Sequence, residues 1–172
     1  LVAEARGAKT PEKIPTIARQ SLWVAAILGV VAMLILQGMP FFLPLFGVPE
    51  SLLPKASLFL HAIGFGMPAV MMYAALRSYS EALGHPRPVT AISLLALLAL
   101  IPLNLVFMYG FGPIPALGSA GCGFATAILQ WLMFITLAIY ISRAQAYKQA
   151  PIFTQWEKLD LGWTKRILKL GF

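Results

Sequence analysis

The sequence predicts an all-α integral membrane protein with four transmembrane helices, and three observations support that prediction. Hydrophobic residues make up 59% of the 172 residues and charged residues only 11%, whereas soluble domains carry about 25% charged residues. The mean hydropathy is +0.81, which is more apolar than a soluble domain of this size can bury. The charged residues are also confined to short segments between long charge-free runs. Lipid is therefore the expected solvent for most of the chain.

The charge-free runs define the expected helices. Residues 20–49, 56–76 and 88–142 contain no Asp, Glu, Lys or Arg, and these runs are 30, 21 and 55 residues long. Because a transmembrane helix needs about 20 apolar residues, the first two runs hold one span each and the third holds two. The third run is interrupted at 110–115, where two glycines and two prolines favour a turn. We expect spans at 21–41, 57–76, 89–109 and 117–141. The runs do not alternate between apolar and polar residues, which argues against the strands of a membrane β-barrel.

The basic residues predict the orientation of these spans. With four spans, 12 of the 13 Lys and Arg residues fall on the side that holds both chain ends, and only Lys55 falls on the other side. Since cytoplasmic segments carry the excess of Lys and Arg, both ends are expected in the cytoplasm. The net charge of +7 is then an orientation signal, and nucleic acid is not an expected partner.

The chain divides into three expected parts. Residues 1–20 are the cytoplasmic end of a preceding helix and a loop, residues 21–143 are the four-helix membrane segment, and residues 144–172 are a cytoplasmic interfacial linker. Both ends look cut, so a fragment of a longer protein is expected. In the linker, apolar residues recur at helical spacing, which fits either an amphipathic helix in the membrane interface or an inner loop with Trp anchors. These residues are Trp156, Leu159, Trp163, Ile167 and Leu170.

The expected spans contain few groups that could carry chemistry. None of them contains an ionisable acid or base of the Asp, Glu, Lys or Arg type, so an ion or proton relay within this segment is not expected. His61 and His85 fall at opposite membrane faces and cannot share a metal ion. No hydrolase, metalloprotease or phosphate-loop motif is present. We therefore expect no metal site, no cofactor and no enzymatic activity.

Uncharged polar residues within the spans have two readings each. Asn104 follows Pro102 by two residues, so its amide either satisfies the carbonyl that proline frees or faces a water-filled cavity. Thr126 either bonds back to the carbonyl of Cys122 or forms a polar strip with Asn104 and Gln130. The prolines predict helix bends and the small residues predict close helix packing. The residues concerned are Pro68 and Pro102 for bends, and Gly118, Gly121, Cys122 and Gly123 for packing.

The stretch from Pro102 to Thr126 resembles the multidrug and toxic compound extrusion (MATE) family, and most closely its NorM-type branch. Pro-Leu-Asn at 102–104, Tyr-Gly at 109–110, Leu-Gly at 117–118, Gly-Cys-Gly at 121–123 and Ala-Thr at 125–126 follow in the family's order and spacing. Weaker matches at 6–9, 67–68, 75–79 and 168–172 extend the resemblance over essentially the whole chain. It implies a segment that runs from the end of helix two to just before helix seven of a twelve-helix transporter. The four spans would be helices three to six of its N-terminal lobe.

The resemblance also implies a function. Such a transporter exports organic cations in exchange for sodium or protons by alternating access, in the bacterial cytoplasmic membrane. Its partners here would be membrane lipid and the remaining helices, and the acids that bind the coupling ion would lie outside this segment. The candidates for the substrate cavity, of which Asn104 and Thr126 match the family best, are Asn104, Thr126, Gln130, Tyr73 and Met67.

One departure from the family and one alternative accompany this interpretation. A sister branch has an aspartate at the position of Asn104 and an asparagine where Leu100 stands, so a proton site on helix five is not expected. The alternative is a non-transporting four-helix scaffold or assembly subunit. A small four-helix multidrug pump would need a membrane acid of its own, and the expected spans have none.

Overall fold

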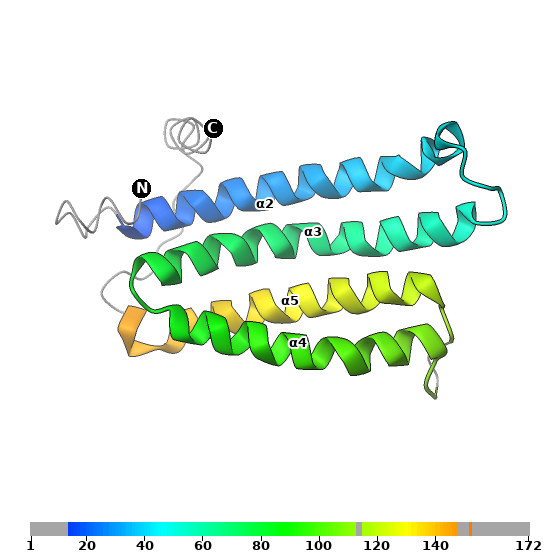
Figure 1. The fold of residues 1–172 in the computed structure, drawn as a ribbon. Coiled ribbons are helices and arrows are strands. Elements are labelled where there is room, and N and C mark those ends of the chain that lie inside the picture. The colour runs from blue at the N-terminus through cyan, green and yellow to red at the C-terminus, as the bar shows by residue number, and fades with distance from the viewer. Residues whose placement is uncertain (1–13, 113–114, 148–151, 153–172) are drawn as a thin grey trace.

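The computed structural model describes residues 14–112, 115–147 and 152, which form four long helices and three short 3-10 helices. The long helices are α2 (Ile14–Gly38), α3 (Leu53–Ala82), α4 (Pro86–Tyr109) and α5 (Ser119–Arg143), and they run up and down in turn (Figure 1). Each is long and apolar enough to cross a membrane. The prediction of four membrane-capable helices is confirmed.

Helices α2, α3 and α4 are longer than the predicted spans, and α5 has the predicted length of 25 residues but begins and ends two residues later. Helix α2 begins seven residues before the predicted start at residue 21, and α3 covers 30 residues where 20 were expected. The extra turns contain charged residues, among them Arg19, Arg77 and Arg143. A long basic side chain can lie along the helix and keep its charge in the interface. A helix can therefore extend beyond its charge-free run, and the length of the run underestimates the length of the helix.

Proline and glycine define the helix ends. Pro54 and Pro86 lie in the first turns of α3 and α4, where the missing N–H has no partner within the helix in any case. Gly84 and Gly110 follow α3 and α4 with φ angles of +75° and +79°, a region that glycine adopts at low cost. The link after α4 then folds back, because the N–H groups of Leu117 and Gly118 donate to the carbonyls of Phe107 and Met108. The predicted turn at 110–115 is thereby confirmed at the residues that are described.

The order of the helices across the bundle is not their order in the chain. Helix α3 packs against α2 and α5, and α5 packs against α4, so the helices form a row α2–α3–α5–α4 (Figure 1). The bundle also has two ends along the helix axes, and we name each of them after a short helix that it contains. The η3 end comprises residues 38–53, 110–112 and 115–118, with η2 (Met39–Phe41) and η3 (Leu43–Phe46). The η4 end comprises the start of α2, residues 83–85, and η4 (Gln145–Tyr147).

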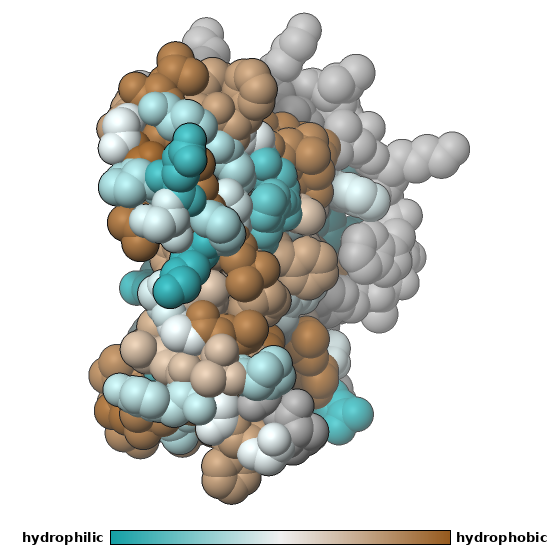
Figure 2. Space-filling model, turned by 90° about the vertical axis from the view of Figure 1, so that its right-hand side faces the viewer, coloured by the Kyte–Doolittle hydropathy of each residue, from teal (hydrophilic) through white to brown (hydrophobic). Residues whose placement is uncertain are grey.

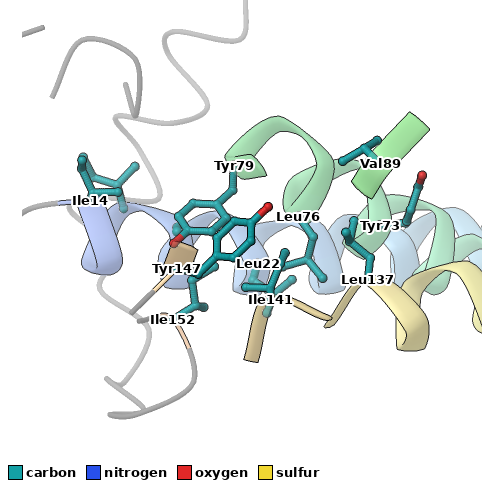
Figure 3. Packing of buried hydrophobic residues seen from close by; sticks show 12 residues of the cluster. Ile14, Leu22, Tyr73, Leu76, Tyr79, Val89, Leu137, Ile141, Tyr147 and Ile152 are labelled. Carbon is teal, nitrogen blue, oxygen red and sulfur yellow. The ribbon is translucent and has the colours of Figure 1, made fainter. Parts of the chain in front are cut away.

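The main apolar cluster lies toward the η4 end and joins all four helices. Tyr79 and Tyr147 lie beside each other there, with Leu76, Leu137 and Ile141 on the side of the helices (Figure 3). Toward the η3 end, large apolar side chains stay exposed, such as Leu34 at 64% and Phe41 at 79%. Figure 2 looks onto that end, where brown hydrophobic residues surround a smaller teal group. Such an exposed apolar surface fits a lipid environment rather than water.

Two expectations fall on residues that the structure does not describe. The amphipathic pattern from Trp156 to Leu170 and the loop at 1–13 lie outside the described residues.

Candidate functional site

An apolar groove lies on one side of the bundle. It has a volume of about 530 Å³ and lies between α3 and α5, with the end of α2 beside it. Its walls are almost entirely apolar and include Phe65, Phe124, Ile128, Trp131 and Ile135. Gln37 and His61 supply its polar part. This volume is within the range of about 300–1,000 Å³ that is usual for small-molecule sites.

Hydrogen bonds fix two of the groove's side chains. The indole N–H of Trp131 donates to the carbonyl of Phe65 at 3.1 Å, which ties α5 to α3. The side-chain amide of Gln37 donates to the carbonyl of His61 at 3.4 Å. Neither Gln37 nor Trp131 was among the predicted site residues. Their positions could have indicated such a role, because each is a hydrogen-bonding side chain within a long apolar run.

The five predicted cavity residues do not line this groove. On α5 the groove is lined by Phe124, Ile128 and Ile135, whereas Thr126 and Gln130 lie about 120–180° around the helix from them at 100° per residue. On α3 the groove is lined by His61, Ala62 and Phe65, and Met67 lies about 160° from Phe65. Asn104 lies on α4, which contributes no lining residue.

Asn104 is the clearest polar candidate outside the groove. Its side-chain oxygen is buried and has no hydrogen-bond partner among the described residues. The first reading, in which the amide satisfies a backbone carbonyl near Pro102, leaves this oxygen unexplained because a carbonyl is itself an acceptor. An unpaired buried acceptor costs about 1–3 kcal/mol, so a donor from another group is expected to meet it.

The polar strip predicted between α4 and α5 is partly accounted for by local hydrogen bonding on α5. The hydroxyl of Thr126 donates to the carbonyl of Cys122 at 2.8 Å, which is the local reading of this residue. Gln130 is half-buried one turn further along the same face, and Cys122 is half-buried as well. Among the described residues, no hydrogen bond joins Asn104 to Thr126 or Gln130, so a strip formed by all three stays a prediction.

Tyr73 is a packing residue in this structure. It is 7% exposed and belongs to the apolar cluster, and its hydroxyl shares a hydrogen bond of 2.9 Å with the hydroxyl of Ser93. This bond connects α3 and α4, which otherwise touch little. Met67 is half-buried, and its backbone lies at the crossing of α2 and α3.

We expect Tyr73→Phe to destabilise the protein only slightly. The ring keeps its place in the cluster and only the bond to Ser93 is lost, which within a membrane costs about 0.6 kcal/mol. The measurement is the thermal unfolding midpoint of Tyr73→Phe, Ser93→Ala and the double variant. If the double variant equals the sum of the two single variants, the hydroxyl pair contributes nothing.

Four glycines allow helices to approach closely. A Cβ at Gly29 would lie 2.5 Å from the Cα of Pro68, and one at Gly123 would lie 3.0 Å from the carbonyl oxygen of Phe59. A Cβ at Gly66 would lie 3.0 Å from the Cα of Ala127, and one at Gly121 would overlap the backbone of Phe107. The predicted packing roles of Gly121 and Gly123 agree with these contacts.

Gly118 departs from the predicted packing role. No atom lies within 4 Å of the position that its Cβ would take, and its φ is +57°. Its role is to turn the chain into α5, since this φ is unfavourable for residues with a Cβ. Pro68 and Pro102 both lie inside unbroken helices, so the predicted bends stay predictions.

A hydrogen-bond relay lies at the η4 end. The hydroxyl of Ser80 donates to the carbonyl of His85 at 2.7 Å and lies 2.5 Å from the hydroxyl of Tyr147. Because Ser80 has a single hydrogen to donate, Tyr147 must be the donor to Ser80. Tyr147 is 2% exposed, and burial raises the pKa of its hydroxyl above 10.0 although the bond to Ser80 opposes the shift. The relay therefore connects the α3–α4 turn to the segment after α5.

The side chains that could bind a metal ion lie apart from one another in the described part of the chain. Within residues 14–112, 115–147 and 152, no three His, Cys, Asp or Glu side chains come close enough to hold a metal ion. His61 lies in α3 toward the η3 end, and His85 precedes α4 at the η4 end. What the described part presents is an apolar groove, an unpaired amide oxygen and tightly crossed helices.

The comparisons with a family model and with known proteins agree on one family. Residues 1–106 match the MatE family. The chain is 75% identical over 171 residues to a probable multidrug resistance protein NorM of Acinetobacter baylyi, which covers 99% of this chain and 38% of that protein. It is 34% identical over 99% of its length to the multidrug resistance protein NorM of Aliivibrio fischeri and 35% identical over 100% to that of Photobacterium profundum. These two matches cover 37% and 38% of the relatives, so the chain spans a little over a third of the proteins it matches. The scaffold alternative is not favoured by these matches, and the chain belongs to the MatE family.

Proposed function

We propose that this chain forms helices three to six of the N-terminal lobe of a MATE multidrug antiporter. The observation that supports this most is the 75% identity to a probable NorM over 99% of the chain. The transporter would export organic cations in exchange for sodium or protons by alternating access. The four membrane-capable helices and their short links are compatible with such a lobe.

We also propose that both ends of the segment face the cytoplasm of a bacterial cell. The basic side chains of Arg19, Arg77, Arg87 and Arg143 all lie toward the η4 end, and Lys55 lies near the η3 end. This distribution supports placing the η4 end inside and the η3 end outside.

The segment would contribute polar contacts and shape rather than charge. Its acids among the described residues are Glu50, in the turn before α3, and Glu81, which pairs with Arg77 at 2.8 Å. Neither lies in the middle of a helix, so the charge of an exported cation and of the coupling ion would be balanced by acids elsewhere in the transporter. The buried oxygen of Asn104 would accept a hydrogen bond from the substrate or from a water that accompanies it.

We expect Asn104→Leu to reduce export of ethidium, a fluorescent organic cation, in cells that express the full-length transporter. Losing an acceptor for a buried donor costs about 1.4 kcal/mol or more, which is roughly a tenfold loss of affinity. Thr126→Val should have a smaller effect because its hydroxyl already bonds to Cys122. The measurement is the initial efflux rate at several ethidium concentrations, normalised to the transporter present in the membrane.

The matched control is Thr136→Val, which alters an exposed threonine on α5, the helix that carries Thr126. It should export ethidium like the unmodified protein. Normal export by both Asn104→Leu and Thr126→Val would assign these residues to packing and remove them from the substrate path.

A further inference from the structure

The groove between α3 and α5 differs in composition from the faces where the helices pack. Helix contacts in membranes favour small residues that let backbones approach, and the crossings at Gly29, Gly66, Gly121 and Gly123 follow this rule. The groove instead presents large side chains, among them Phe65, Phe124, Trp131 and Ile135. This composition favours a flexible hydrocarbon chain as the occupant over a further helix.

The groove is poorly suited to an organic cation. No acid is among the residues that line it. A cation buried there would lose its hydration without gaining a counter-charge, which is unfavourable. The nearest acid at the η3 end is Glu50, which lies in the turn before α3 and does not line the groove.

A positive charge lies beyond the η3 end of the groove, outside its lining. Lys55 is exposed in the first turn of α3 and precedes Ala62, a lining residue, by seven residues. That spacing is two helical turns, so both residues share one face about 10.5 Å apart along the axis. His61 and Gln37 add polar groups between Lys55 and the apolar part. The groove is therefore apolar toward the middle of the helices and polar toward the η3 end, and Lys55 lies beyond that end on the same face of α3.

We propose that this groove binds one acyl chain of a phospholipid with an anionic headgroup, from the membrane leaflet on the η3 side. The acyl chain lies against Phe65, Trp131 and Ile135, and the phosphate faces Lys55 with His61 and Gln37 as hydrogen-bonding neighbours. A Lys near the membrane surface attracts an anionic lipid with an energy equivalent to roughly a fivefold preference. The proposal requires that α3 and α5 cross a membrane, and it does not depend on which compounds the transporter exports.

The test uses Trp131 as a reporter in the full-length transporter, with all other tryptophans replaced by phenylalanine. The protein is reconstituted into vesicles of phosphatidylcholine and phosphatidylglycerol, and one of the two lipids carries bromine in the middle of its acyl chains. Bromine quenches indole fluorescence on contact. We expect brominated phosphatidylglycerol to quench Trp131 with an apparent affinity about fivefold higher than that of brominated phosphatidylcholine, and Lys55→Gln to abolish this preference.

Trp23 is the matched control, because it is 38% exposed on α2 and does not line the groove. Trp23 lies one turn after Arg19, so it can show a preference of its own for the anionic lipid, and Lys55→Gln should leave that preference unchanged. The proposal is overturned if Trp131 responds equally to both lipids, which would indicate ordinary surrounding lipid. It is equally overturned if neither lipid quenches Trp131, which would mean that another part of the transporter covers the groove.

Filling the groove separates a bound lipid from an effect of surface charge. Ile128 is 38% exposed and lines the groove, so Ile128→Phe should occupy part of its volume without replacing a buried residue. We expect this variant to lower the affinity of Trp131 quenching several-fold while Lys55 is unchanged. Unaltered quenching in Ile128→Phe would contradict an acyl chain inside the groove.

Discussion

Replacing Gly29 by alanine should strongly destabilise the packing of α2 on α3. The added Cβ would lie 2.5 Å from the Cα of Pro68 and 3.1 Å from the carbonyl oxygen of Met67. Both are backbone atoms, so no side chain can rotate away, and one helix must shift. Overpacking of this kind costs about 1–3 kcal/mol, and the upper part of that range is expected because Pro68 is buried and stiff. The measurement is the thermal unfolding midpoint of the purified full-length transporter, together with the fraction that elutes as a single species.

Gly38→Ala provides a matched control on the same helix. Gly38 is the last residue of α2, and nothing lies within 4 Å of the position of its Cβ. Its replacement should change stability by less than about 0.5 kcal/mol. Equal stability of Gly29→Ala and Gly38→Ala would mean that α2 and α3 are separated more widely than the structure has them.

The contact at Gly29 shows what a single sequence reveals about helix packing. Ala25 and Gly29 are small residues four apart, and this pattern predicts a close crossing. The sequence analysis recognised the same pattern near Gly121 and Gly123 and did not apply it to α2. The partner position, Pro68, could not be found in this way, because the spacing of small residues marks one face of a helix without naming the helix that meets it.

The existence of four helices was predictable because it depends on local properties. A charge-free run of 20 residues in lipid must satisfy its own backbone hydrogen bonds, and a helix does so within the segment. The helix ends were less predictable, since Arg19 and Arg77 continue α2 and α3 beyond the charge-free runs. The order α2–α3–α5–α4 was not predictable, because it is set by contacts between side chains far apart in the chain.

The candidate site also has features that could be predicted from the sequence and features that could not. The back-bond of Thr126 to Cys122 was predictable because it spans four residues of one helix. The groove was not, because it needs His61, Trp131 and Gln37 from three helices. The role of Asn104 was only partly predictable. Its polarity was visible in the sequence, but its unpaired oxygen is known only from the packing around it.

Truncating Tyr147 to alanine should have the largest effect on the η4 end. Its ring centroid lies 5.9 Å from that of Tyr79, 5.5 Å from that of His85 and 6.2 Å from that of Tyr140, so three elements lose a shared contact. Removing a buried aromatic ring costs about 3–5 kcal/mol. The sequence analysis placed residues 144–172 in an interfacial linker, whereas Tyr147 is 2% exposed. Its partner Ser80 lies 67 residues earlier, a separation that no local pattern can detect.

Two further variants separate the ring from the hydroxyl. Tyr109→Ala removes a tyrosine that is 72% exposed near the η3 end, and it should leave the unfolding midpoint nearly unchanged. Tyr147→Phe should cost only about 0.5–1.5 kcal/mol, since Ser80 keeps the carbonyl of His85 as its acceptor. If Tyr147→Ala were no less stable than Tyr147→Phe, the ring contacts would contribute nothing and the segment after α5 would not be held by packing.

The hydroxyl should also give the η4 end a dependence on pH. Burial raises the pKa of Tyr147 above its ordinary value of 10.0, so the folded state holds this proton more tightly than the unfolded state does. The stability that follows is fully present below pH 10 and is lost as the pH rises through the folded-state value. The unmodified protein should therefore lose more stability than Tyr147→Phe between pH 9 and pH 11, measured as unfolding midpoints at each pH. Parallel curves for the two proteins would mean that the hydroxyl of Tyr147 is not buried as the structure has it.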